Sequence, residues 1–591
     1  MEQILIIGVI GIVAVVFVTS LAPRFGVAAP LMLVLLGIGV SLLPFVKPIE
    51  IDPEWVLGGM LPLLLYSTAV NTPLMEFRRD LPTISLFAVL LVVASAVSVG
   101  FLLVWLVPSL PLGVGIAVGA IVSPTDAVAT TIVRQSGASQ RIVTVLEGEA
   151  LFNDASALVL LRSAIAAVSA SFSFWHITLD FVYAVVVAIG IGLAVGYINL
   201  AVRRRIAQVA SNVAFSLVVP FLAFLPAEHL GASGLVAAVV AGLITGDHTA
   251  KHLPSEVRIT ERAVWRTIEL LLESAIFLLM GLQLFALHED AVITHQNEWL
   301  ALGLGAAAAT VVIVIRSVFV AGAVHLLSRR TQRLGERQER ITLLQEWLEE
   351  ADSTSVAPVP RLVAPAAAFV ATTARMGRES GTYRRGRLRK LLEKQQADLD
   401  YLAAEQFGWK DGAILVVAGM RGAITLAAAQ SLPLSTPHRS LLILTAFVVA
   451  AGTLLIQGGT LALLVKALKL SPRDPSADAE LTSALRVQLN RAALSELDAG
   501  QWRRKDGSAY SAESVHAARK LMETALRVGE QTNTAAESVE AVELRLEIIE
   551  AQRSELLRIR DLGTFPSGLL ETKLMQLDAE QLGVELRLRQ D

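Results

Sequence analysis

The chain has 591 residues, of which 54% are hydrophobic and only 17% are charged, and its mean hydropathy is +0.59. Soluble proteins carry roughly 25% charged residues, so this composition indicates a protein surrounded by membrane lipid. A net charge of −3 gives no sign of a nucleic-acid partner. The sequence contains no cysteine, which excludes disulfides, thiolate catalysis and cysteine-bound metal centres, and we expect no cofactor.

Apolar runs long enough to cross a bilayer recur over the first 470 residues. Taking about 20 residues for each crossing, we predict about thirteen transmembrane helices. They cover residues 4–22, 25–45, 55–73, 84–107, 112–133, 142–168, 177–201, 211–226, 230–246, 267–288, 299–327, 412–431 and 440–468. No basic segment precedes the first run, so we expect a retained helix rather than a cleaved signal.

Basic residues are distributed unevenly over the loops between these spans. With the N-terminus outside, the cytoplasmic loops hold clusters such as Arg203, Arg204 and Arg205, whereas the opposite loops hold only Lys47 and Arg439. This asymmetry agrees with the positive-inside rule. We therefore expect a multi-pass protein of the plasma membrane, with its N-terminus outside and its C-terminal tail in the cytoplasm.

Two charged regions with helical character fall on the predicted cytoplasmic side. Residues 328–411 form a loop between the eleventh and twelfth spans. In the tail, 471–591, apolar residues recur at helical spacing, and Gly563 is a predicted helix stop. The predicted fold is thus all-α, with a transmembrane domain at 1–470 and a helical tail that either binds an unknown regulator or is a plain solvated extension.

Five charged residues lie near the middle of predicted spans: Asp126, Glu149, Asp154, Arg316 and Arg421. Each costs about 2.5–3.5 kcal/mol at the bilayer centre, so together they would cost on the order of 12–18 kcal/mol if they faced lipid. They must therefore face one another, water or an ion.

The sixth span presents two adjacent polar stripes. Glu149 and Asn153 share a helix face, whereas Asp154 is rotated by about 100°. Arg316 is the basic residue near the middle of its own span, so we expect it to pair with Glu149 and keep that group ionised. Asp154 is then free to face a cavity. Because burial disfavours a charged acid, Asp154 can hold either a proton or a small cation, and the two would compete for it.

Two spans are expected to be discontinuous, as in many secondary transporters with inverted repeats. Pro124 cannot donate a backbone hydrogen bond, and Gly422 follows Arg421 in the twelfth span. Broken helices leave partial charges in the bilayer, which Asp126 and Arg421 would offset as structural charges. The other ligands of a cation should be oxygen atoms from Thr125, from Asp126 or Asn153, from water, and from freed carbonyl groups.

Five motifs, in this order, resemble the sodium/proton exchanger branch of the cation:proton antiporter superfamily: SPTDAVAT, GEALFNDASALVL, GASGLVAAVVAGL, ESAIFLLMGLQL and GMRGAITLA. The resemblance implies a homodimer of thirteen-helix protomers that exchange Na⁺ for H⁺. Each protomer would contain a dimerisation domain and a core domain that moves like an elevator, with the fifth and twelfth helices unwound and crossing.

The resemblance also implies which residues of this chain form the ion-binding site. It places the Asn-Asp pair of the family at Asn153 and Asp154, with Asp154 as the acid that binds Na⁺ and carries the proton. The threonine-aspartate pair falls on Thr125 and Asp126, so that Thr125 is a second Na⁺ ligand. The glutamate of helix six and the two arginines fall on Glu149, Arg316 and Arg421. Members with Asn-Asp are generally electroneutral, which implies one proton for each cation.

Three positions depart from the family pattern. Ala150 replaces a serine that helps to ligate the ion in many relatives, Ala127 replaces a proline, and Ser67 lies near a common acid position. These changes leave the preference among Na⁺, K⁺ and Li⁺ open. Glu147 is expected to line a funnel or lie at the interface. Glu269 and Glu273 are expected to be solvated rather than catalytic, although an ion funnel would favour these two acids.

Other functions remain as alternatives. A K⁺/H⁺ antiporter would keep the same mechanism. A gated cation channel would belong to another class, and the chain lacks a selectivity-filter motif. The segment ITGD at 244–247 resembles an intramembrane protease, but it lacks the longer protease motif and a second matching aspartate. We therefore expect a transporter and not an enzyme.

Overall fold

The computed structural model describes residues 2–25, 27–43, 52–135, 138–169, 174–294, 296–332, 390–402, 408–422, 424–468, 475–500, 502–504, 506–528 and 539–588. These residues contain helices and no strands, which confirms the all-α prediction. The chain divides into two units, each described by itself. The first contains Met1–Ala323 and Trp409–Pro472, and the second contains Val324–Gly408 and Arg473–Asp591.

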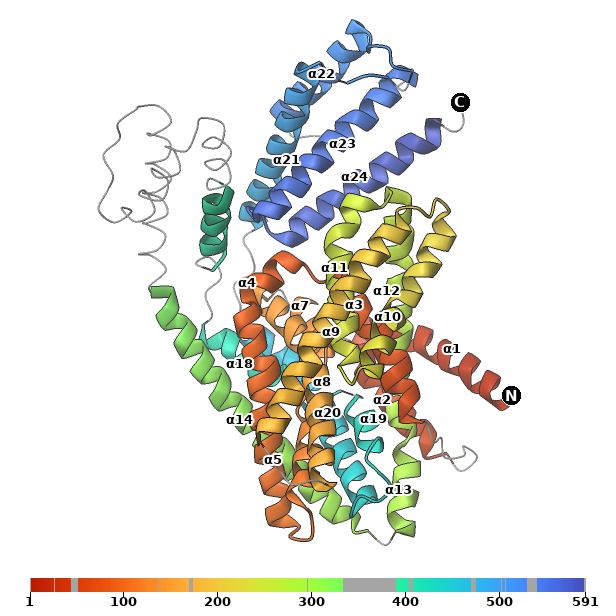
Figure 1. Cartoon of the computed structure of the whole chain (residues 1–591), viewed down its shortest axis with the longest axis vertical. Helices are drawn as coiled ribbons and strands as arrows, with labels where there is room; N and C mark the ends of the chain where they lie inside the picture. The colour runs from red at the N-terminus through yellow and green to blue at the C-terminus, as the bar shows by residue number, and fades with distance from the viewer. Residues whose placement is uncertain are drawn as a thin grey trace. The chain divides into compact units, whose positions relative to one another are not determined.

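Figure 1 shows the helices of the first unit. They are α1 (Glu2–Phe25), α2 (Ala29–Ser41), the π-helical η1 (Trp55–Met60), α3 (Leu61–Asn71), α4 (Leu74–Ser85), the π-helical η2 (Leu86–Leu91), α5 (Val92–Leu106), α6 (Leu112–Val122), α7 (Val128–Gln135), α8 (Gln140–Ser169), α9 (Phe174–Arg203), α10 (Val209–His229), α11 (Gly234–His252), α12 (Ser255–Leu282), α13 (Leu284–Ile293), α14 (Glu298–Gln332), α18 (Trp409–Val417), α19 (Ile424–Gln430) and α20 (Arg439–Ala467).

Each predicted span coincides with one of these helices or with a pair of them. Among the described residues, seven helical stretches are long and apolar enough to cross a membrane, and shorter apolar helices such as α2 and α6 accompany them. The fifth and twelfth predicted spans are divided, into α6 and α7 and into α18 and α19. Two helical stretches begin earlier than predicted: α12 begins at Ser255 rather than near residue 267, and the stretch Leu74–Leu106 begins ten residues before the predicted start at 84.

The membrane helices of the first unit pack as two groups. The α12 group consists of α1, α2, α3, α9, α10, α11 and α12, and the α8 group consists of α4, η2, α5, α6, α7, α8, α14, α18, α19 and α20. Within the α12 group, α2 and α12 approach closely at Gly37 and Gly281. A Cβ atom on Gly37 would lie 2.5 Å from the Leu278 carbonyl oxygen, so only glycine permits this contact.

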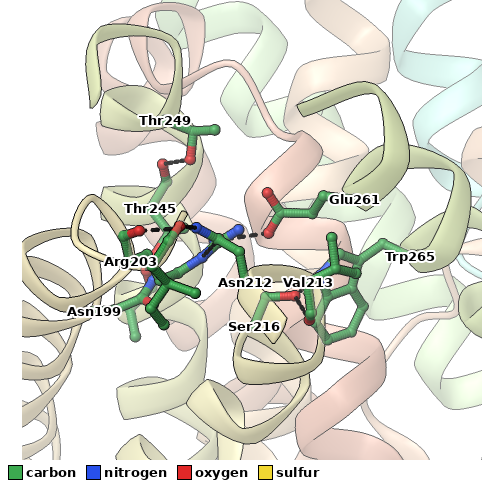
Figure 2. A network of polar contacts seen from close by, with 11 residues as sticks. Asn199, Arg203, Asn212, Val213, Ser216, Thr245, Thr249, Glu261 and Trp265 are labelled. Atoms are coloured by element: carbon green, nitrogen blue, oxygen red, sulfur yellow. Dashed lines mark hydrogen bonds and ion pairs between the residues drawn. The ribbon is translucent and has the colours of Figure 1, made fainter. Parts of the chain in front are cut away.

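A buried polar network ties the α12 group together (Figure 2). Arg203, the last residue of α9, donates to Asn212 of α10 at 2.7 Å and to Glu261 of α12 at 2.8 Å. One turn further along α12, the indole N–H of Trp265 donates to Ser216 at 3.2 Å. The sequence assigns Arg203 to a cytoplasmic loop, but in the structure it is the last residue of α9 and is fully buried. Its guanidinium is buried because Glu261 and Asn212 supply the charge and hydrogen bonds that burial requires.

The second unit contains a bundle of helices in the tail. They are α21 (Pro475–Asp498), α22 (Ala512–Val528), α23 (Val539–Leu562) and α24 (Ser567–Leu588). α23 runs beside α21 and α24 (Figure 1). It ends where Gly563 adopts a φ of 76°, which confirms the predicted stop. Most of the predicted loop 328–411 lies outside the described residues.

Candidate functional site

The two discontinuous helices meet at their breaks. The chain is not helical at residues 123–126, between α6 and α7, or at residues 419–422, between α18 and α19. Pro124 and Gly422 lie within these segments. The backbone N–H of Asp126 donates to the carbonyl of Met420 at 2.9 Å, so the two breaks lie directly against each other.

Arg421 lies at the carbonyl ends of two half-helices. Its guanidinium donates to the carbonyl groups of Val122 at 2.9 Å and Ser123 at 3.2 Å, where α6 ends. It also donates to the carbonyl of Gly419, just beyond α18. The carbonyl end of a helix carries partial negative charge, so this buried cation offsets the partial charges of both half-helices.

Asp126 lies at the opposite, N–H ends of the broken helices. Its carboxylate accepts a hydrogen bond from the backbone N–H of Val128, in the first turn of α7, at 3.0 Å. A Cβ atom on Gly422, just before α19, would lie 1.8 Å from Oδ2 of Asp126. Glycine at 422 therefore lets this carboxylate approach the start of α19. Because N–H ends carry partial positive charge, Asp126 complements Arg421.

Glu149 and Arg316 form a buried ion pair between α8 and α14. The two guanidinium nitrogens of Arg316 lie 2.5 and 2.9 Å from the two carboxylate oxygens of Glu149. Nε of Arg316 donates to the carbonyl of Leu415 in α18 at 2.8 Å. Both side chains are almost fully buried. A bidentate pair of this kind combines opposite charges with two parallel hydrogen bonds, so each side chain fixes the position of the other.

Thr125 links this ion pair to Asn153. The Thr125 hydroxyl donates to Glu149 at 3.1 Å, and it accepts a hydrogen bond from Nδ2 of Asn153 at 2.7 Å. Asn153 also donates to the carbonyl of Thr125 at 3.2 Å. Its own Oδ1 atom is buried and has no hydrogen-bond partner among the described residues. Asn153 therefore offers an unused oxygen beside a hydroxyl that is already engaged twice.

Asp154 lies on a different face of α8 from Glu149 and Asn153, and it is only 6% exposed. Its carboxylate forms no hydrogen bond or ion pair with any residue that the structure describes. It lines two cavities, one on each side of it along α8. The larger has a cavity volume of about 80 Å³ and extends towards Glu147, and the smaller has a cavity volume of about 10 Å³ and extends past Ala157 and Leu161.

The larger cavity lies between the two helix groups. Five acidic residues line it: Asp126, Glu147 and Asp154 from the α8 group, and Glu269 and Glu273 from the α12 group. Three of them have polar partners among the described residues: Glu147 pairs with Arg134, Glu269 accepts a hydrogen bond from Ser67 at 3.1 Å, and Asp126 accepts one from the backbone N–H of Val128. No basic side chain is among the described residues that line this cavity. Such a cleft attracts cations.

The structure thus brings Thr125, Asp126, Asn153 and Asp154 to one region, beside the charges of Glu149, Arg316 and Arg421. Two further residues belong to this region: Glu269 and Glu273 are partly buried and line the cavity, the position that an ion funnel would give them. Their separation of four residues places both on one face of α12, and this spacing was the available signal. Ala150 lines the cavity without a hydroxyl group, and Ser67 is turned towards Glu269.

Comparison with known proteins identifies relatives. The family model described as "Sodium/hydrogen exchanger, transmembrane" matches residues 11–379 and 388–467. The uncharacterized Na(+)/H(+) exchanger YjcE of Escherichia coli is 33% identical over 48% of this chain and 53% of its own length. A sodium, potassium, lithium and rubidium/H(+) antiporter of Bacillus pumilus is 31% identical over 47% of this chain and 43% of its own length. The chain thus spans about half the length of these relatives.

A solved structure shows a similar fold. The sodium proton antiporter MjNhaP1 of Methanocaldococcus jannaschii superposes with a TM-score of 0.54 over 80% of this chain and 100% of that chain, at 17% sequence identity. An identity this low supports the fold alone. The family model covers more than half of the sequence and includes both broken helices and the Asp154 cavity, so this chain belongs to the sodium/hydrogen exchanger family.

Proposed function

We propose that this chain exchanges a monovalent cation, Na⁺ foremost, for H⁺ across a membrane. The observation that carries the proposal is the carboxylate of Asp154, which is buried, has no partner among the described residues and lies between two cavities. A buried carboxylate needs neutralisation, and either a proton or a cation supplies it. Because one excludes the other, each departing cation is replaced by a proton.

The residues around Asp154 supply the rest of the cation site. The unused Oδ1 atom of Asn153 is one oxygen ligand. The hydroxyl of Thr125 retains one lone pair after its two hydrogen bonds, and Asp126 lines the same cavity. Glu149, Arg316 and Arg421 act as fixed structural charges. We therefore assign cation and proton binding to Asp154, with Asn153, Thr125 and Asp126 as its oxygen-bearing neighbours.

The exchange is proposed to be electroneutral. Glu149 is compensated by Arg316, and Asp126 and Arg421 complement the ends of the broken helices. Asp154 is then the carboxylate that cycles between one proton and one cation, so no net charge crosses the membrane.

A K⁺/H⁺ antiporter with the same mechanism is the second candidate. The Bacillus pumilus relative is named for sodium, potassium, lithium and rubidium, and Ala150 removes a hydroxyl that could favour one ion. The same transport assay with K⁺ and Li⁺ in place of Na⁺ distinguishes these ions.

The cavity layout supports alternating access. The larger cavity extends from Asp154 towards Glu147 and the exposed Arg134, which the positive-inside rule places on the cytoplasmic side. On the other side of Asp154 lies the smaller cavity, whose walls are apolar apart from Asp154 and Thr425. We propose that this is an inward-facing state, and that the α8 group moves like an elevator against the α12 group within a plasma-membrane homodimer.

The test uses the purified protein in proteoliposomes with an imposed pH gradient. Adding Na⁺, Li⁺ or K⁺ should drive proton movement that a lumenal dye reports and that clamping the voltage does not alter. Asp154→Asn should abolish this signal, whereas Asp180→Asn, which removes an exposed carboxylate of α9, should retain it. Full activity of Asp154→Asn would overturn the site, and charge movement that scales with voltage would overturn electroneutrality.

A further inference from the structure

Glu273 presents a carboxylate to the cation cavity from the opposite helix group to Asp154. It lies on α12 and lines the larger cavity together with Ile276 and Phe277. Its side chain forms no hydrogen bond or ion pair with the described residues, in contrast to Glu269 one turn earlier, which accepts a hydrogen bond from Ser67. Glu273 also lies close enough to Asp126 to interact with it electrostatically.

α12 holds Glu273 in a fixed position within its own group. Three turns before Glu273, Glu261 is bound to Arg203 at 2.8 Å in the buried network of Figure 2. About two turns after Glu273, Gly281 packs against α2, where a Cβ atom would lie 2.4 Å from the Val34 carbonyl oxygen. The helix is therefore anchored on both sides of Glu273, and this carboxylate stays with the α12 group.

The charges of the cavity leave Glu273 without compensation. Glu147 has Arg134, Glu269 has Ser67, and Asp126 lies at helix N–H ends. Asp154, which is nine-tenths buried and has no partner among the described residues, faces the same space. Two uncompensated carboxylates on opposite walls, with no basic side chain lining the space between them, form a binding environment for a cation.

We propose that Glu273 is a cation-binding residue of the α12 group, which captures the incoming cation in the cavity and passes it to Asp154. This inference rests on the proposed function. Because Glu273 does not belong to the helix group that carries Asp154, it contributes to capture and not to the number of ions exchanged. Removing its charge should therefore weaken the apparent affinity for the cation and leave the maximal rate and the stoichiometry unchanged.

The test is Glu273→Gln in the same proteoliposomes, with Na⁺ varied at fixed pH. The KM for Na⁺ should rise by about tenfold at low ionic strength, since a carboxylate-lined cleft concentrates cations by at least that factor, while kcat stays near that of the wild type. Glu256→Gln, which removes a carboxylate from the first turn of the same helix, should leave the KM unchanged. Glu273→Asp, which keeps the charge, should retain most of the affinity.

A second measurement uses the wild-type protein, so that the proposal can be tested even if the Glu273→Gln variant misfolds. Raising the ionic strength with N-methyl-D-glucamine chloride should raise the KM for Na⁺ of the wild type, because salt screens a charge in an open cavity. It should affect Glu273→Gln much less. An unchanged KM in Glu273→Gln, or a lost kcat with an intact KM, would overturn the capture role. If Asp154→Asn remains active, the proposed function fails instead, so the two failures are distinguishable.

Discussion

The ion pair of Glu149 and Arg316 shows how single residues constrain this protein. Neither charge has access to water, so each depends on the other. Through Thr125 the pair also fixes Asn153, and through Leu415 it holds the end of α18. The pair therefore positions the cation site without itself exchanging ions.

Removing either partner should destabilise the protein strongly. Arg316→Ala and Glu149→Ala should each lower the free energy of unfolding by about 3–5 kcal/mol, because each leaves an unpaired buried charge. The double variant should be less destabilised than the sum of the two, as shown by thermal unfolding of the purified protein. Arg162→Ala removes one partner of an ion pair with Glu228 whose arginine is 63% exposed, and it should cost at most about 1 kcal/mol. Additive effects of the two buried substitutions would show that they are not partners.

Several of these residues could be predicted from the sequence, because a charged side chain in the middle of an apolar span must face another charge, water or an ion. This argument found Glu149, Arg316 and Asp154. It failed for Arg203, whose partner Glu261 is 58 residues away and whose neighbours Arg204 and Arg205 suggest a loop. It failed for Glu273 because a sequence does not show whether a carboxylate near the end of a span faces solvent or a cavity. Nor does it show that the hydroxyl of Thr125 is already engaged by two side chains.

At the scale of elements, the crossing of the broken helices depends on the space around Gly422. Gly422→Ala should reduce transport by roughly 10- to 100-fold, because the added methyl group displaces Asp126 and the crossing, and small misplacements in a site have effects of this size. Gly452→Ala, at a position in α20 where a Cβ atom meets nothing within 4 Å, should retain activity and stability. Transport assays and thermal unfolding of both variants check this. Wild-type activity of Gly422→Ala would show that the crossing tolerates a wider spacing.

The breaks themselves follow from local sequence. Pro124 interrupts one helix, and Gly419 and Gly422 weaken the other, so their existence was predictable. The contact between the breaks, by contrast, was expected only from the resemblance to the exchanger family, since the hydrogen bond from Asp126 to Met420 joins segments nearly 300 residues apart and no local pattern reveals it. The extension of α12 to Ser255 was also missed. Its first turns are polar, and their buried face includes Glu261 and Trp265, for which Arg203 of α9 and Ser216 of α10 supply hydrogen-bond partners.

At the scale of the whole molecule, the site lies where two helix groups meet, and relative motion of the groups is the basis of the proposed exchange. The chain has no cysteine, so introduced pairs can be cross-linked cleanly. Linking Arg162→Cys in α8 to Glu228→Cys in α10 joins the two groups and should stop transport. Linking Ser109→Cys to His438→Cys joins two positions within the α8 group, so this cross-link should leave transport intact. Transport before and after reduction of each cross-link measures the effect, and persistent activity of the first pair would argue against movement between the groups.

The lining of the small cavity beyond Asp154 determines whether protons can leak through the protein. Apart from Asp154 and Thr425, it is lined by apolar residues such as Ile121, Leu158 and Leu161. A buried water molecule needs two to four polar partners, so these walls do not support a continuous file of water through which protons could hop. A protein resting in the proposed inward-facing state should therefore leak few protons through this side of the site.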